Sequence, residues 1–179
     1  MRQFLLQMAG EPGAGKSTLA RAIGEETGAV VLDKDVIKSA ALNAGAPEDL
    51  AGPLAYEVFF AVARSFCSHG HSVVLDSPAF FPDIPEKGCQ IAKDYDAAYF
   101  IVRCQSPLEE LVSRLSERPA QASQWQGIAS PVAYKAKLDA ELSRRGVGEL
   151  AFLHLTLDTT QPLQVCLEQA LAYIGHDAG

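Results

Sequence analysis

The chain has 179 residues, of which 48% are hydrophobic and 21% are charged, and this balance is typical of one soluble globular domain. Its formal net charge of −7 argues against a dedicated binder of nucleic acid, which usually presents a basic face. Runs of about 18 or more apolar residues are absent, so we expect no membrane span.

Short β-rich runs alternate with amphipathic helical stretches along the chain. We expect strands at 4–8, 29–32, 71–75, 98–102 and 152–157. We expect helices at 16–27, 36–43, 53–69, 85–94, 106–117, 131–145 and 162–174. This alternation predicts an α/β fold, in which a mostly parallel, doubly wound sheet lies between two layers of helices. Ligands of such folds bind beyond the carboxyl ends of the strands.

Two of the expected helices carry more detailed predictions. One side of the helix at 53–69 is expected to be its apolar face, formed by Leu54, Val58, Ala61, Val62 and Ser65. The helix at 106–117 is expected to begin with Ser106 as N-cap, Pro107 at the first helical position and Glu109 closing a capping box. Pro119 ends it, and the residues at 119–131 have no clear periodicity.

The segment between the first strand and the first helix matches the phosphate-binding pattern G-x-x-x-x-G-K-[ST]. It consists of Gly10, Glu11, Pro12, Gly13, Ala14, Gly15, Lys16, Ser17 and Thr18. Glycines let the backbone curl so that N–H groups point at phosphates, and the following helix adds its positive end. Lys16 would neutralise the β- and γ-phosphates, and Ser17 would bind Mg²⁺. We therefore expect this loop to bind ATP together with Mg²⁺.

Other classes of phosphate-loop protein fit the sequence less well. A switch GTPase reads guanine with an N-K-x-D element, but the only asparagine here, Asn43, is followed by Ala44. Transporter ATPases need a second glycine-rich signature and a longer chain. The remaining class is a compact kinase that transfers a phosphoryl group to a molecule bound beside the loop.

The loop, the segment at 32–38 and the strand at 73–76 together resemble the small phosphate-loop kinases. These include zeta toxin-like kinases, chloramphenicol phosphotransferase, gluconokinase, adenylylsulfate kinase and polynucleotide 5′-hydroxyl kinase. The resemblance implies a P-loop three-layer sandwich over a single domain, 1–179, with five parallel strands in the order 2-3-1-4-5. It also implies a small lid at about 114–131, but no single substrate.

The acceptor side is expected after the second strand, where the sequence at 32–38 resembles the D-x-D-x-x-[RK] element of these kinases. A hydroxyl that attacks phosphorus loses its proton as the bond forms, and a carboxylate can accept that proton. Asp35 is the first candidate for this base and Asp33 the second. Lys38, one helical turn further on, could hold an anionic part of the acceptor or of the transferring phosphoryl group. Aspartates at a helix start are also favourable without any catalysis.

Asp76 ends the third strand and is expected to orient Mg²⁺ together with Ser17. It could also touch the acceptor, or simply form a turn with Ser77 and Pro78.

Arg114 and Arg118 lie four residues apart, and the resemblance implies that such arginines stabilise charge on the transferring phosphoryl group. The alternative for Arg114 is a surface ion pair with Glu110. The segment at 158–162 either caps the last helix or lies near the nucleobase.

The sequence therefore predicts a kinase that moves the γ-phosphoryl of ATP to a hydroxyl of a small molecule, such as a sugar, a nucleoside-like metabolite or an antibiotic. A 5′-hydroxyl polynucleotide kinase and a non-catalytic nucleotide switch or toxin-system protein are the alternatives. Four cysteines without a close pair, at 67, 89, 104 and 166, favour reduced thiols and a cytoplasmic location.

Overall fold

A computed structural model of the chain describes residues 2–79, 83–117, 128, 130–145 and 152–176. Five strands form one sheet: β1 (Phe4–Ala9), β2 (Val30–Asp33), β3 (Val73–Asp76), β4 (Ala98–Gln105) and β5 (Leu155–Asp158). Their order is β2-β3-β1-β4-β5, and each neighbouring pair is parallel. The strand order implied by the resemblance is therefore confirmed.

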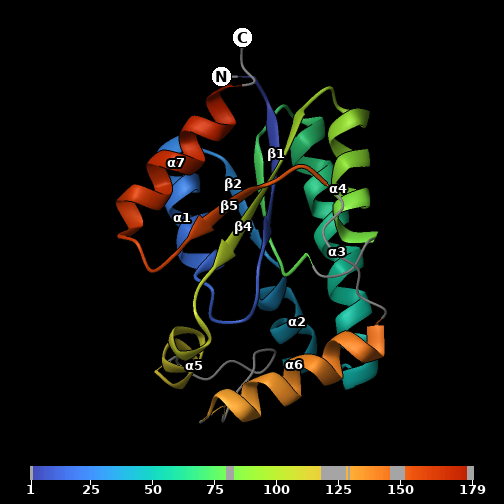
Figure 1. The fold of residues 1–179 in the computed structure, drawn as a ribbon. Helices are drawn as coiled ribbons and strands as arrows, with labels where there is room; N and C mark the ends of the chain where they lie inside the picture. The colour runs from blue at the N-terminus through green and yellow to red at the C-terminus, as the bar shows by residue number, and fades with distance from the viewer. Residues whose placement is uncertain (1, 80–82, 118–127, 129, 146–151, 177–179) are drawn as a thin grey trace.

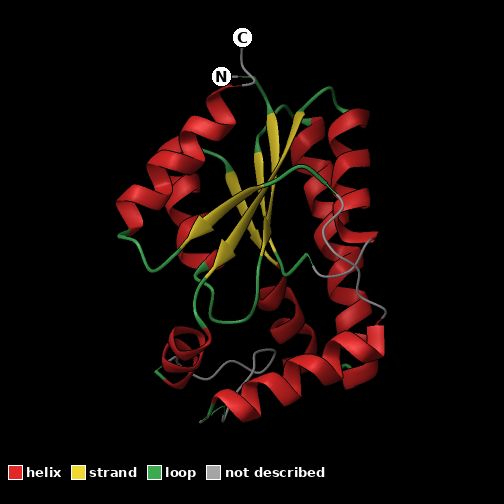
Figure 2. Ribbon diagram, in the orientation of Figure 1, coloured by secondary structure: helices red, strands yellow, loops and turns green. Residues whose placement is uncertain are grey.

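Helices cover both faces of this sheet (Figure 1). They are α1 (Lys16–Thr27), α2 (Lys34–Asn43), α3 (Glu48–Ser68), α4 (Asp83–Asp94), α5 (Leu108–Ser116), α6 (Pro131–Arg145) and α7 (Leu163–His176). Figure 2 shows α1 and α7 on one face and α3 and α4 on the other, whereas α2, α5 and α6 lie beyond the carboxyl ends of the strands. The predicted three-layer α/β/α sandwich is confirmed, and α2, α5 and α6 surround the edge where ligands of such folds bind.

The sheet is buried on both sides, so β1 is apolar at nearly every position rather than alternating with polar residues. Phe4, Leu6 and Met8 belong to the core under α1 and α7. Leu5 and Ala9 belong to a second core under α3 and α4. The two cores fix β1 at the centre of the sheet, and with it the loop that follows β1.

The side of α3 that was expected to be its apolar face is not the side that it buries. Its buried residues are Ala51, Ala55, Phe59, Phe60, Ala63 and Cys67. Leu54 and Val58 are instead 41% and 39% exposed. This helix is apolar on most sides and has the length and hydropathy of a membrane-crossing helix, so its pattern does not define one face. Burying two phenyl rings removes more apolar area from water than burying a leucine and a valine.

Three local expectations also need correction. The capping box at α5 does not form: the helix begins at Leu108, and its N-cap position, Pro107, makes no side-chain cap hydrogen bond. Ser106 bonds elsewhere, as described below. β5 spans Leu155–Asp158 rather than starting at 152, and α2 begins at Lys34 with Asp33 as its N-cap. The cysteines at 67, 89, 104 and 166 are free thiols.

Candidate nucleotide and acceptor site

The loop between β1 and α1 has a backbone that only glycine adopts easily. Gly10, Gly13 and Gly15 have φ angles of 128°, 87° and 82°, in the left-handed region. The Ala14 N–H closes a turn onto the Glu11 carbonyl at 3.1 Å. Gly15 then begins α1 as its N-cap residue. The loop therefore leads directly into the positive end of a helix, the geometry that suits a bound phosphate.

Four neighbouring segments contact this loop: β4, α5, α6 and the turn after β5. A Cβ atom on Gly10 would lie 2.3 Å from the Cys104 carbonyl oxygen in β4, and one on Gly13 would lie 2.7 Å from the Leu111 carbonyl oxygen in α5. The Thr159 hydroxyl donates to the Ala14 carbonyl at 2.9 Å, and the Tyr134 hydroxyl donates to the Pro12 carbonyl at 3.0 Å. Two of the glycines are thus needed for packing as well as for phosphate access.

Replacing Gly13 with alanine is expected to lower the free energy of unfolding by about 2–4 kcal/mol. The new methyl group would meet the Leu111 carbonyl, and the left-handed φ would be strained. Urea denaturation followed by circular dichroism measures this change.

Gly52→Ala is the matched control, because a Cβ there meets nothing within 4 Å and the residue lies inside α3. It should stabilise the protein by about 0.5–1 kcal/mol. A Gly13→Ala protein as stable as wild type would contradict this prediction and show that α5 can move away from the new methyl group at little cost in free energy.

Lys16, Ser17 and Asp76 come together where β1 and β3 end. Asp76 is 5% exposed, and the Ser17 hydroxyl hydrogen-bonds to its carboxylate. Burial raises the pKa of Asp76, the Ser17 hydrogen bond and the nearby Lys16 lower it, and the carboxylates of Asp33 and Asp35 raise it further. The Lys16 ammonium donates to the Glu11 carbonyl at 2.9 Å. The structure thus brings the three side chains that were expected to serve phosphate and Mg²⁺ into one place.

The donor set of this site fits Mg²⁺ bound together with ATP. A hydroxyl and a carboxylate are hard oxygen ligands, and Mg²⁺ usually takes few protein ligands, completing its shell with phosphates and water. Among the described residues, no group of three or more His, Cys, Asp and Glu side chains could hold a metal ion. Ser17 and Asp76 are the side chains that would hold this ion, with phosphate and water completing its shell.

Asp33 and Asp35, the two candidate bases, have different surroundings. Asp33 Oδ1 accepts from the backbone N–H groups of Asp35 and Val36 at 2.8 and 3.4 Å, which is a standard N-cap arrangement. The Asp35 carboxylate forms an ion pair with the Lys34 ammonium. Asp33 also pairs with Asp76 in the register of β2 and β3, so all three carboxylates lie at the same edge of the sheet.

Lys34 is a site residue that the sequence interpretation missed. It is 9% exposed, and its ammonium lies 5.7 Å from the centre of the Tyr56 ring, within cation–π range. A lysine in the first turn of a helix opposes the helix dipole, so its position between two aspartates was a usable signal. The Tyr56 contact brings α3 beside the ion pair of Lys34 and Asp35.

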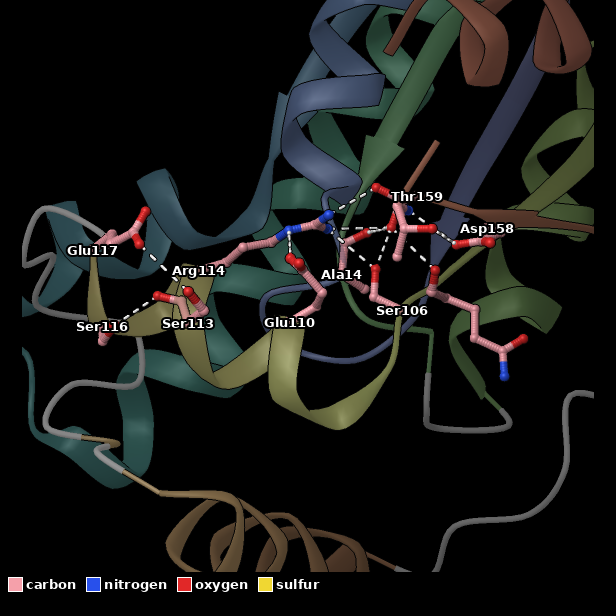
Figure 3. A network of polar contacts seen from close by, with 11 residues as sticks. Ala14, Ser106, Glu110, Ser113, Arg114, Ser116, Glu117, Asp158 and Thr159 are labelled. Atoms are coloured by element: carbon pink, nitrogen blue, oxygen red, sulfur yellow. Dashed lines mark hydrogen bonds and ion pairs between the residues drawn. The ribbon is translucent and has the colours of Figure 1, made fainter. Parts of the chain in front are cut away.

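Arg114 lies at the other side of the loop, in a network with the turn after β5 (Figure 3). Its guanidinium donates to the Thr159 carbonyl at 2.8 Å and to the Ser106 hydroxyl at 3.1 Å. It also pairs with Glu110 at 3.2 Å, as one of the sequence alternatives expected. Thr159 in turn holds Ala14, so Arg114 supports the loop through an intermediate residue.

The turn after β5 has a double role. Asp158 Oδ1 accepts from the Thr160 N–H at 2.9 Å and from the Thr160 hydroxyl at 2.7 Å, an Asx-type turn before α7. Thr159 points the other way, toward the loop (Figure 3). A Cβ on Gly15 would lie 3.6 Å from Thr159 Cβ and 3.8 Å from Arg114 Nη1. Asp158 therefore closes a turn before α7, which begins at Leu163, and the position of this segment near the nucleobase stays a prediction.

Two further predicted site residues, Lys38 and Arg118, remain. Lys38 lies in α2, partly buried, one turn after Asp35. Arg118 and most of the expected lid, 119–127 and 129, lie outside the described residues.

A buried amide that sequence analysis overlooked supports the strand ends. Gln7 of β1 is fully buried, and its Nε2 donates to the carbonyls of Leu75 and Ser77 at 3.2 and 3.3 Å. These bonds tie β1 to both sides of Asp76.

Comparison with known proteins agrees with this geometry. A family model described as "AAA domain" matches residues 5–132. Among curated proteins, Rv2004c of Mycobacterium tuberculosis and Mb2027c of Mycobacterium bovis, both uncharacterized, are each 29% identical over 126 residues. That match covers 64% of this chain but only 25% of each relative, so the chain spans about a quarter of their length.

Solved structures show the same fold. A gluconokinase from Sinorhizobium meliloti has a TM-score of 0.65 and 18% identity, with 98% of this chain and 94% of that one covered. The APS kinase of Mycobacterium tuberculosis, solved with AMPPNP and APS, has a TM-score of 0.67 and 19% identity, with 96% of both chains covered. A sugar kinase from Janibacter has a TM-score of 0.66 and 18% identity, with 98% and 95% covered. Identities this low show the fold alone. Because the family model matches more than half of the chain, the protein belongs to the AAA domain family, with the fold of a small phosphate-loop kinase.

Proposed function

We propose that this protein is an ATP-dependent kinase that transfers the γ-phosphoryl group to a hydroxyl of a small molecule. The observation that carries the proposal is the meeting of two sets of side chains at one edge of the sheet. Lys16 and Ser17 come from the phosphate loop, Asp76 and Asp33 end β3 and β2, and Asp35 lies in the first turn of α2. Carboxylates beside the phosphate loop offer a base for an acceptor hydroxyl as well as a ligand for Mg²⁺.

Each residue has a proposed role. Mg²⁺-bound ATP supplies the phosphoryl group and the leaving group. Lys16 neutralises charge on the β- and γ-phosphates, and Ser17 and Asp76 hold the ion. Asp35 accepts the proton of the acceptor hydroxyl, with Lys34 as its ion-pair partner. Lys38 is proposed to hold an anionic part of the acceptor.

The proposed acceptor is a small molecule such as a sugar, a nucleoside-like metabolite or an antibiotic. The net charge of −7 disfavours a nucleic-acid end as substrate. The gluconokinase and the APS kinase with the same fold act on small molecules by their names, which agrees with this class. We further propose that the chain works in the cytoplasm as a single domain with a lid at about 114–131.

The proposal is tested by measuring ADP formation from ATP across alcohol-bearing metabolites, nucleosides and 5′-hydroxyl oligonucleotides. We expect at least one small alcohol to stimulate turnover, with the phosphorylated product seen by mass spectrometry. Stimulation by oligonucleotides alone would identify a polynucleotide kinase. ATP binding with slow hydrolysis that no acceptor stimulates would favour a nucleotide switch.

The resemblance implies that Arg114 and Arg118 stabilise charge on the transferring phosphoryl group, and the contacts of Arg114 suggest a different test. Replacing Arg114 with methionine is expected to weaken Mg²⁺-ATP binding by roughly 5- to 30-fold, because the bonds to Ser106 and Thr159 support the loop. The value of kcat at saturating ATP should fall less than about threefold. Isothermal titration and steady-state kinetics separate the two effects.

Arg64→Met is the control, because Arg64 forms an ion pair with Asp94 on the surface, away from the loop. It should leave both quantities near wild type. A loss in kcat of about 10³-fold or more in Arg114→Met would instead support a direct contact with the transferring group.

A further inference from the structure

Tyr134 of α6 is buried against the phosphate loop. Its side chain is 1% exposed and packs in the same core as Ala14, Leu111 and Leu115. Its hydroxyl donates to the carbonyl oxygen of Pro12 at 3.0 Å, across 122 residues of sequence. α6 therefore contacts the loop itself through a directed hydrogen bond.

That bond fixes more than one atom, because a peptide unit is planar. The carbonyl of Pro12 and the N–H of Gly13 belong to the same peptide and point in opposite directions. Gly13 has a φ of 87°, and glycine imposes little barrier to rotation of this peptide. With the Pro12 carbonyl bound to Tyr134, the Gly13 N–H must point away from α6.

The Thr159 hydroxyl orients a second peptide of the loop, the one between Ala14 and Gly15, in the same way. Thr159 donates to the carbonyl of Ala14 at 2.9 Å, and that carbonyl shares its peptide with the N–H of Gly15. The Glu11 carbonyl is bound as well, by the Ala14 N–H and by Lys16. Protein donors thus hold the carbonyls of residues 11, 12 and 14, which leaves the amides of the two glycines to face a phosphate.

We propose that Tyr134 is a positioning residue for the nucleotide: it orients the Gly13 N–H and thereby couples α6 to nucleotide binding. This inference rests on the proposed ATP binding. Because coupling is reciprocal, a nucleotide that needs the oriented Gly13 amide must in turn stabilise the contact between α6 and the loop. α6 follows the expected lid in the chain, so the contact links nucleotide binding to the helix at the end of that segment.

The test uses Tyr134→Phe, which removes the hydroxyl and keeps the ring. Tyr99→Phe is the matched control, because the Tyr99 hydroxyl is buried and has no hydrogen-bond partner among the described residues. We expect Tyr134→Phe to bind Mg²⁺-AMPPNP about 3- to 10-fold more weakly than wild type, and Tyr99→Phe to bind it equally well. Isothermal titration gives the affinities, and thermal melting shows that both variants are folded.

Hydrogen exchange provides a second measurement, one that a purely structural role would not change. Mg²⁺-AMPPNP should slow amide exchange in α6 of wild type and Tyr99→Phe, and this protection should be lost in Tyr134→Phe while protection of α1 remains. Equal affinity of Tyr134→Phe and wild type would overturn the inference, and so would wild-type α6 that is not protected by nucleotide. A wild-type protein that does not bind Mg²⁺-AMPPNP at all would overturn the proposed function itself.

Discussion

Asparagine in place of Asp35 is expected to slow phosphoryl transfer by about 10²- to 10⁴-fold while leaving the affinity for Mg²⁺-ATP within about twofold of wild type. The amide has nearly the same shape but cannot accept the proton of the acceptor hydroxyl. The nucleotide contacts proposed above come from other residues, so ground-state binding of ATP should persist. Single-turnover transfer with the acceptor found in the screen, together with titration of Mg²⁺-AMPPNP, measures the two quantities.

Asp33→Asn is the matched control for this experiment. Asp33 Oδ1 accepts the N–H groups of Asp35 and Val36, and asparagine is an equally good N-cap. Transfer and melting temperature should therefore stay close to wild type. If Asp33→Asn abolishes transfer and Asp35→Asn does not, the base is Asp33. If neither variant loses transfer, no carboxylate of this pair acts as base.

The ion pair between Lys34 and Asp35 gives this comparison its physical basis. A buried ammonium is costly unless it is paired, and the ion pair with Lys34 fixes the direction of the Asp35 carboxylate. Among the described residues Asp33 forms no ion pair, and its Oδ1 is committed to the start of α2. The sequence left these two aspartates as alternatives because their spacing is compatible with either role. The structure distinguishes them by their partners.

Short-range patterns account for what could be predicted from the sequence. The loop at 10–18 is a continuous motif, and both its strand and its helix are adjacent in the chain. Asp33 and Asp76 end strands, and parallel strand ends meet at one edge by geometry alone. The strand order came from the resemblance to small phosphate-loop kinases.

Contacts between distant parts of the chain account for what could not be predicted. Thr159 and Ala14 are 145 residues apart, and Tyr134 and Pro12 are 122 apart. Ser106 looked like an N-cap locally, but its hydroxyl lies 2.6 Å from that of Thr159 and accepts from Arg114. A tertiary hydrogen bond overrode a local capping preference of about 1 kcal/mol. α3 shows the same limit, since its apolar pattern did not specify which side meets the sheet.

Asp76→Asn is expected to stabilise the protein without nucleotide while impairing its Mg²⁺-dependent activity. Burial raises the pKa of Asp76, so its ionised form destabilises the folded state at neutral pH. Asparagine removes that charge and can still accept the hydrogen bond from Ser17. A gain of about 1 kcal/mol would raise the melting temperature by about 2–4 °C. Loss of the carboxylate should raise the Mg²⁺ concentration needed for half-maximal turnover by about 10- to 100-fold.

The pH dependence of this stabilisation has a definite sign. A carboxyl group whose pKa is raised on folding contributes stability that is fully present below its unfolded pKa of about 4, and that contribution is lost as pH rises through the folded pKa. The difference in melting temperature between Asp76→Asn and wild type should therefore be small in acid and grow toward neutral pH. Asp94→Asn is the control of opposite sign, because the Arg64 hydrogen bond lowers the pKa of that exposed carboxyl. This variant should melt at or below the temperature of wild type at neutral pH. Melting curves recorded across this pH range, without Mg²⁺ or nucleotide, test the prediction. If Asp76→Asn melts below wild type at neutral pH, the ionised Asp76 stabilises the fold. The interactions with Ser17 and Lys16 then outweigh the effect of burial on this carboxylate.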